Sequence, residues 1–137
     1  MPTAAAGRVW PGAVPASETV LLVGETASQP DAIEALLRSG LRVRRCARYR
    51  EALQIINRCA ISIVFCHEHL ADGSWRDILA RLSAVPEHPP VVVLTDALDS
   101  SLWAEAIGAG AFDVLLTPIL EPEVRRVCQT VPQRPTA

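Results

Sequence analysis

Lysine is absent from this sequence, and all 13 basic residues are arginines. Any mechanism that requires a lysine ammonium group is therefore excluded. C-x-x-C pairs are also absent, because the four cysteines stand apart at positions 46, 59, 66 and 128. This spacing does not support a structural zinc site, and we expect reduced cysteines that serve as small apolar residues.

Long apolar runs are missing as well. No run approaches the ~20 residues that a membrane-spanning helix needs. The first twenty residues lack the basic and then apolar pattern of a secretory signal. We therefore expect a cytoplasmic protein that makes no membrane contact.

The sequence does contain enough apolar material for a core. Its 137 residues are 50% hydrophobic, which fits one domain that needs neither metal nor disulfide support. We expect a flexible arm over residues 1–18, rich in Ala, Pro and Gly, and an ordered domain over residues 19–131. Residues 132–137 are expected to form a loose tail.

Positive charge gathers in one stretch, although the net charge of −2 makes nucleic acid an unexpected partner. Between positions 38 and 58, seven arginines stand against a single acidic residue, Glu51. Two interpretations remain open, a solvated edge of the domain or a docking patch for an acidic partner or a nucleic-acid phosphate. The candidates for a partner surface are Arg42, Arg44, Arg45 and Arg48.

Strand and helix signals alternate along the chain. Short apolar or alternating runs predict strands over residues 19–23, 41–47, 61–66, 91–95 and 113–116. Apolar residues at helical spacing predict a helix after each strand. The second strand alternates apolar residues with arginines, which is typical of the edge of a sheet.

Capping signals and large side chains refine two of the helices. Ser74 and Asp77 suit the start of one helix, and Ser100 or Ser101 can cap the next. The tryptophans of these helices, Trp75 and Trp103, are both assigned to inward-facing stripes and are expected in the core.

The alternation predicts an α/β fold. Right-handed crossovers place helices on both faces of a parallel sheet. The compatible architecture is flavodoxin-like, a doubly wound five-stranded parallel sheet of order 2-1-3-4-5 with five helices. Its working site should lie beyond the carboxyl ends of the strands, among residues 24–26, 66–69, 95–96 and 117–118.

Four segments together resemble the response-regulator receiver family of two-component signalling. Residues 20–23 resemble the first strand, and the Leu-Ala-Asp-Gly-Ser run at 70–74 resembles the family's L-P-D-G-S turn. Residues 91–95 resemble a fourth strand that ends in Ser or Thr. Residues 108–115 resemble the G-A-x-D-Y-L segment, and Pro118 matches the proline that follows it. In this order the segments cover residues 19 to about 131.

The resemblance implies a defined chemistry. In the family, two or three carboxylates at the ends of strands 1 and 3 bind Mg²⁺. The aspartate that ends strand 3 attacks the phosphorus of a phosphorylated partner. The metal and a lysine neutralise the developing charge, and a Ser or Thr hydroxyl bonds the new phosphoryl group.

This chain departs from that scheme at the phosphoacceptor position. Counting back from Asp72, the position of the aspartate is occupied by His67. The acidic pair after strand 1 is reduced to one carboxylate, and a threonine replaces the lysine. The other pocket positions, by family pattern, are Gly24, Glu25, Thr95, Thr117 and Pro118. The resemblance also implies a cis peptide bond before Pro118.

We therefore predict a stand-alone pseudo-receiver that is not an enzyme and has no catalytic residues. An imidazole cannot form the aspartyl phosphate, and histidine is a poor ligand for Mg²⁺, so binding of that ion is expected to be weak or absent. The expected partner is a protein, either a histidine kinase or another regulator. A homodimer through the face formed by the fourth helix, fifth strand and fifth helix is a further option.

The rival prediction is a metal- or small-ligand-binding flavodoxin-like domain that uses the same cleft. A cluster of possible metal ligands is formed by Cys66, His67, Glu68 and His69, and Glu25 or Asp96 could complete a site for zinc or another transition metal. The main candidates are Glu25, His67 and His69. The simpler alternative leaves Cys66 in the core and both histidines in an exposed loop. A third possibility is that His67 senses pH beside Glu25, since imidazole titrates near neutrality.

Overall fold

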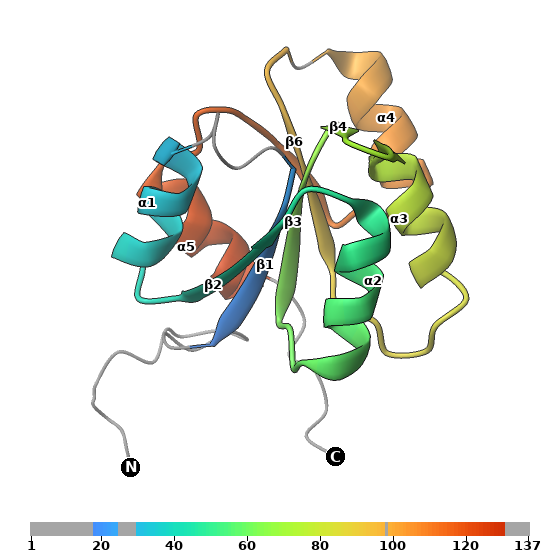
Figure 1. The fold of residues 1–137 in the computed structure, drawn as a ribbon. Helices are drawn as coiled ribbons and strands as arrows, with labels where there is room; N and C mark the ends of the chain where they lie inside the picture. The colour runs from blue at the N-terminus through green and yellow to red at the C-terminus, as the bar shows by residue number, and fades with distance from the viewer. Residues whose placement is uncertain (1–17, 25–29, 98, 131–137) are drawn as a thin grey trace.

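The computed structural model describes residues 18–24, 30–97 and 99–130. Within these ranges the chain forms a parallel sheet with helices on both faces (Figure 1). Glu25 and both terminal segments lie outside the described residues. The expectations for the arm, the tail and the pairing of Glu25 with His67 are therefore untested.

The central sheet has five parallel strands in the order β2-β1-β3-β6-β7. When these five strands are numbered by their order along the chain, the order in the sheet is 2-1-3-4-5, so the predicted strand order is confirmed. The strands are β1 (Thr19–Val23), β2 (Arg42–Cys46), β3 (Ile63–His67), β6 (Val91–Thr95) and β7 (Asp113–Leu116). As predicted, the arginine-rich strand lies at an edge.

Five helices surround the sheet within the described ranges: α1 (Pro30–Arg38), α2 (Tyr49–Arg58), α3 (Trp75–Leu82), α4 (Ser100–Gly108) and α5 (Glu121–Thr130). Figure 1 shows α1 and α5 on one face, with α2, α3 and α4 on the other. Each face of the central strands is therefore covered, as a parallel sheet requires.

Two apolar cores fill the space between the layers. Val20 and Leu22 point toward α1 and α5, whereas their neighbours Leu21 and Val23 point toward α2 and α3. This alternation follows from the two-residue period of a strand. All four side chains are buried, and each contributes about 1.5–3 kcal/mol of burial free energy.

The run of residues 69–74 forms a small antiparallel hairpin that the sequence did not predict. Its strands are β4 (His69–Leu70) and β5 (Gly73–Ser74). Asp72, in the turn between them, accepts a hydrogen bond from the backbone N–H of Tyr49 at 2.8 Å. The Asp72 carboxylate therefore caps the N-terminus of α2, which gives the Asp-Gly turn a structural role.

The two capping predictions have different outcomes. Ser74 and Asp77 form a capping box, and the Ser74 N–H donates to the Asp77 carboxylate at 2.9 Å. The prediction that Ser100 or Ser101 caps α4 is wrong. Asp99 is the cap, because its carboxylate accepts the N–H of Leu102 at 2.7 Å.

The two tryptophans also differ. Trp75 is fully buried, as predicted, but Trp103 is 48% exposed, so its assignment to the core is wrong. The buried stripe of α4 runs through Leu102 and Ala106, which are four residues apart. Trp103 is one position past Leu102, which turns its side chain about 100° away from the sheet.

Candidate functional site

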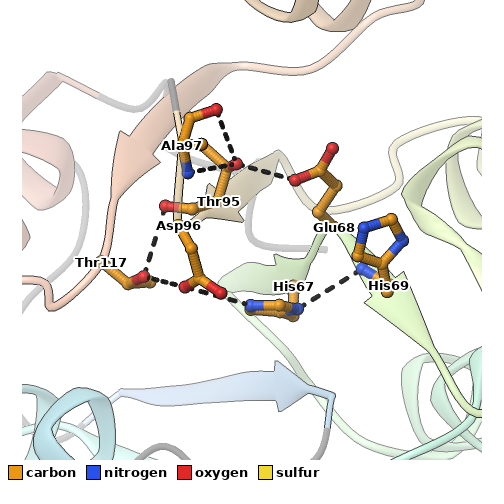
Figure 2. A network of polar contacts seen from close by, with 7 residues as sticks. All are labelled: His67, Glu68, His69, Thr95, Asp96, Ala97 and Thr117. Atoms are coloured by element: carbon orange, nitrogen blue, oxygen red, sulfur yellow. Dashed lines mark hydrogen bonds and ion pairs between the residues drawn. The ribbon is translucent and has the colours of Figure 1, made fainter. Parts of the chain in front are cut away.

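The candidate site, which we call the cleft, is the edge of the sheet at the carboxyl ends of four neighbouring strands. Gly24 follows β1, His67 ends β3, Thr95 ends β6 and Thr117 follows β7. The structure thus gathers these predicted positions at one edge of the sheet. Figure 2 shows the polar contacts that three of them, His67, Thr95 and Thr117, make with neighbouring residues.

His67 occupies the base of this cleft and is not the exposed loop residue of the simpler alternative. It is the last residue of β3, and its side chain is only 14% exposed. Gly24 packs directly against it, since a Cβ added at Gly24 would lie 2.8 Å from the Cβ of His67. Gly24 also has a φ of +143°, a conformation that L side chains rarely adopt. An acidic side chain at position 24 therefore does not fit beside His67 with this backbone.

The hydrogen bonds of His67 indicate its tautomer. Nδ1 accepts a hydrogen bond from the backbone N–H of His69 at 3.4 Å. The neutral ring therefore carries its proton on Nε2. That nitrogen is enclosed and has no hydrogen-bond partner among the described residues, but it lies 3.7 Å from the Asp96 carboxylate.

Asp96 lies at the mouth of the cleft, between two side chains from other strands. The Thr117 hydroxyl donates a hydrogen bond to its carboxylate, and His67 faces the same oxygen (Figure 2). The Thr117 hydroxyl, followed by the nearby imidazole, holds the pKa of Asp96 below its ordinary value. The carboxylate therefore stays charged at neutral pH.

Glu68 forms the second carboxylate contact in the cleft. The buried Thr95 hydroxyl donates to Glu68 Oε1 at 2.7 Å and accepts from the Ala97 N–H at 3.2 Å. In Figure 2, Glu68 turns toward Thr95 while His67 turns toward Asp96. Both cleft hydroxyls, Thr95 and Thr117, are thus already donating to carboxylates.

The sequence-based interpretation missed these two carboxylates. The sequence suggests both only as possible metal ligands, Glu68 within the cluster at residues 66–69 and Asp96 as a residue that could complete the site. A usable signal was present, because each directly adjoins a cleft residue: Glu68 follows His67 and Asp96 follows Thr95. Their pairing with specific hydroxyls depends on side-chain directions across strands, which the sequence alone does not give.

Described residues give the metal alternative little support. They hold no group of three or more His, Cys, Asp or Glu side chains that could hold an ion. The rings of His67 and His69 lie 6.5 Å apart between centroids. Cys66 is buried, and burial raises the pKa of its thiol, so it remains protonated and a poor ligand. Glu25 lies outside the described residues.

Three further expectations concern the peptide bond before Pro118, the cysteines and membrane-spanning helices. The Thr117–Pro118 peptide is cis, as the resemblance implied. All four cysteines are free, with Cys66 and Cys128 buried and Cys46 and Cys59 partly buried. Within the described residues, no helix is both long and apolar enough to cross a membrane.

All seven arginines of the 38–58 stretch are exposed. Only Arg38 forms an ion pair with a carboxylate within the described part of the chain, at 2.9 Å from Glu34. Arg44 donates to the sulfur of Cys59 at 3.4 Å, and Arg50 lies over the ring of Tyr49. The stretch therefore presents a surface of largely uncompensated positive charge.

Strand order and cleft position define the class: a doubly wound α/β domain with its site at the switch point between β1 and β3. The family model of the response regulator receiver domain matches residues 20–129. The chain therefore belongs to the response regulator receiver domain family of two-component signalling.

Solved structures agree with this assignment. A putative response regulator from Chloroflexus aurantiacus J-10-fl is 30% identical, with a TM-score of 0.72 over 81% of this chain and 94% of that one. A response regulator from Thermotoga maritima has 23% identity and a TM-score of 0.72, covering 83% of this chain and 99% of the other. The receiver domain of a putative Luxo repressor from Vibrio parahaemolyticus has 22% identity and a TM-score of 0.71, covering 80% and 85%. The search of curated proteins finds no match.

Proposed function

We propose that this receiver domain does not accept a phosphoryl group by the aspartyl route and works by protein contact alone. The observation that supports the proposal is which residues occupy the cleft and which hydrogen bonds they already form. His67 stands at the acceptor position, and the hydroxyls of Thr95 and Thr117 already donate to Glu68 and Asp96. The domain would then be a pseudo-receiver, without turnover of its own.

Charge opposes phosphorylation in this cleft. A phosphoryl group brings about 1.5–2 negative charges at neutral pH. It would approach the carboxylates of Asp96 and Glu68, and no lysine exists anywhere in the chain to compensate. Like charges at about 4 Å repel by roughly 1 kcal/mol even at the dielectric of water, and by more where water is excluded. Entry of the group is therefore unfavourable.

The residues that the structure describes also do not fit Mg²⁺. This hard ion prefers near-octahedral oxygen ligands, whereas position 24 offers no side chain and position 67 offers an imidazole. Weak or absent Mg²⁺ binding belongs to the same proposal, and calorimetric titration with MgCl₂ measures it.

Incubation with acetyl phosphate and Mg²⁺ tests the proposal. Intact-mass spectrometry should show an unmodified chain, because no group in the cleft is both a suitable acceptor and free of repulsion. A stoichiometric, acid-labile adduct would overturn it. An active receiver domain treated in parallel shows that the donor works.

Stepwise restoration of the family residues sharpens this test. His67→Asp alone is expected to remain unphosphorylated, because Asp96 still faces the new carboxylate and position 117 has no cation. The triple variant His67→Asp, Asp96→Ala and Thr117→Lys removes the repulsion and supplies the cation, so it should gain some adduct. Full phosphorylation of the single variant would show that His67 alone accounts for the loss.

For partners, we propose a histidine kinase or another regulator, and a homodimer through the α4–β7–α5 face. Two of its elements carry an exposed apolar side chain, Trp103 on α4 and Leu116 on β7. Sedimentation of the wild type and of Leu116→Ser tests the dimer. A monomer at tens of micromolar in both proteins would remove this part of the proposal.

A further inference from the structure

The outer edge of β2 combines two features. No strand of the described chain pairs with it, and it carries a row of exposed arginines. In the five-stranded sheet, β2 pairs only with β1, so no strand of the described chain covers its other side. Arg42, Arg44 and Arg45 are exposed, and no described carboxylate forms an ion pair with any of them. We define these three residues, with Val43 between them, as the β2 edge.

Backbone directions along the β2 edge follow from its pairing. The Arg42 N–H donates to Glu18 at 2.9 Å, and the Cys46 carbonyl accepts from Gly24 at 2.8 Å, so both residues turn their backbone groups toward the sheet. Backbone groups alternate in direction along a strand. Those of Val43 and Arg45 therefore point away from β1, where a further strand would pair.

Side-chain directions place charge on both faces of this edge. Arg44 lies opposite Leu21, which belongs to the core beneath α2 and α3. Arg45 lies opposite Leu22, which belongs to the core beneath α1 and α5. A strand added beside β2 would have its alternate side chains within reach of guanidinium groups on both faces.

We propose that the β2 edge binds an acidic, extended segment of another protein by strand addition. The N–H and C=O groups of Val43 and Arg45, with which no strand of the described chain pairs, would pair with its backbone, and Arg42, Arg44 and Arg45 would bind its carboxylates. Residues 1–17 and 131–137 do not supply this segment, because they contain no acidic residue. A protein segment also fits better than nucleic acid, which offers no backbone amides for strand pairing.

This inference deepens the contact role proposed above. Its failure is distinguishable from failure of the pseudo-receiver proposal, because the binding assay contains no phosphoryl donor. Charged edges also discourage aggregation, and that protective role predicts no binding of an added strand. The two explanations therefore separate by experiment.

The test measures fluorescence anisotropy with a labelled peptide of about eight residues that alternates glutamate with threonine. We expect the wild-type protein to bind it. Arg42→Gln, Arg44→Gln and Arg45→Gln together should weaken binding at least about tenfold, since three charge-assisted contacts are lost. The same peptide N-methylated at alternate residues should lose binding, because it cannot donate the pairing hydrogen bonds.

A matched triple variant controls for overall charge. Arg76→Gln, Arg125→Gln and Arg126→Gln remove three exposed arginines that lie on α3 and α5, and this protein should bind the peptide like the wild type. Circular dichroism verifies that both variants fold. No binding by the wild type, equal losses in both variants, or undiminished binding of the N-methylated peptide would each overturn the proposal. Tighter binding of an oligothymidylate, lost in the same β2 variant, would overturn it in favour of nucleic acid.

Discussion

The cores and the cleft of this receiver domain stand in contrast. The central strands are buried on both faces, the capping box of α3 is complete, and the peptide before Pro118 is cis. In the cleft, by comparison, His67, Thr95 and Thr117 face the carboxylates of Asp96 and Glu68. Under the proposal above, His67, Gly24 and Thr117 replace two carboxylates and a lysine of the family. The fold is held by burial and backbone pairing, whereas the chemistry of the cleft depends on a few polar side chains.

Truncating the two tryptophans should give the largest difference in stability. Trp75→Ala removes a fully buried side chain from the core and should lower the free energy of unfolding by about 3–5 kcal/mol. Trp103→Ala acts at a half-exposed site and should cost less than about 1 kcal/mol. Urea unfolding measures both, and equal losses would contradict the exposure of Trp103.

Removing the Thr95 hydroxyl should have the next largest effect. Thr95→Val keeps the shape of a buried side chain but leaves Glu68 without its hydroxyl donor. The expected loss is about 1–3 kcal/mol, because a partly buried acceptor loses its partner. Thr130→Val, at an exposed helix end, is the control and should change stability by less than about 0.5 kcal/mol. If Thr95→Val leaves the free energy of unfolding unchanged, the contact between Thr95 and Glu68 does not stabilise the fold.

The cap of α4 offers a smaller test. Asp99→Ala removes the side chain that accepts the Leu102 N–H, and it should destabilise the protein by about 1 kcal/mol. Ser100→Ala should be nearly neutral, because Ser100 is already inside the helix. If Ser100→Ala lowers the temperature of thermal unfolding more than Asp99→Ala does, Ser100 caps α4, as the sequence suggested.

The pKa of Asp96 should show the smallest effect. Thr117→Val removes the hydroxyl that chiefly lowers this pKa, so the value should rise toward that of an ordinary aspartate. Stability from a lowered carboxyl pKa is present above the unfolded pKa of about 3.9 and is lost as the pH falls through the folded value. Because the Asp96 side chain is 76% exposed, the change in stability should be slight.

Carboxyl-carbon NMR titration of the wild type and Thr117→Val measures the Asp96 pKa directly. Asp99, whose partner is a backbone N–H on α4, serves as an internal reference in both spectra. An unchanged Asp96 titration would mean that Thr117 does not hold this carboxylate.

The sequence predicted the scaffold better than the cleft, for physical reasons. Buried strands such as Val91–Thr95 begin with a run of consecutive apolar residues, which is a local signal that can be recognised without knowledge of the neighbouring strands. Trp103 was misplaced because one position on a helix changes the direction of a side chain by about 100°. Long-range contacts were harder still. Asp72 capping α2 and Asp96 meeting Thr117 both join residues more than twenty positions apart.

A crystal structure determined with beryllofluoride and Mg²⁺ shows whether the cleft can hold a phosphoryl mimic and its metal ion. We expect a cleft without either species, in which Thr117 still donates to Asp96 and Thr95 still donates to Glu68. A beryllofluoride group bonded to a carboxylate of the cleft, beside a coordinated Mg²⁺, would contradict this expectation.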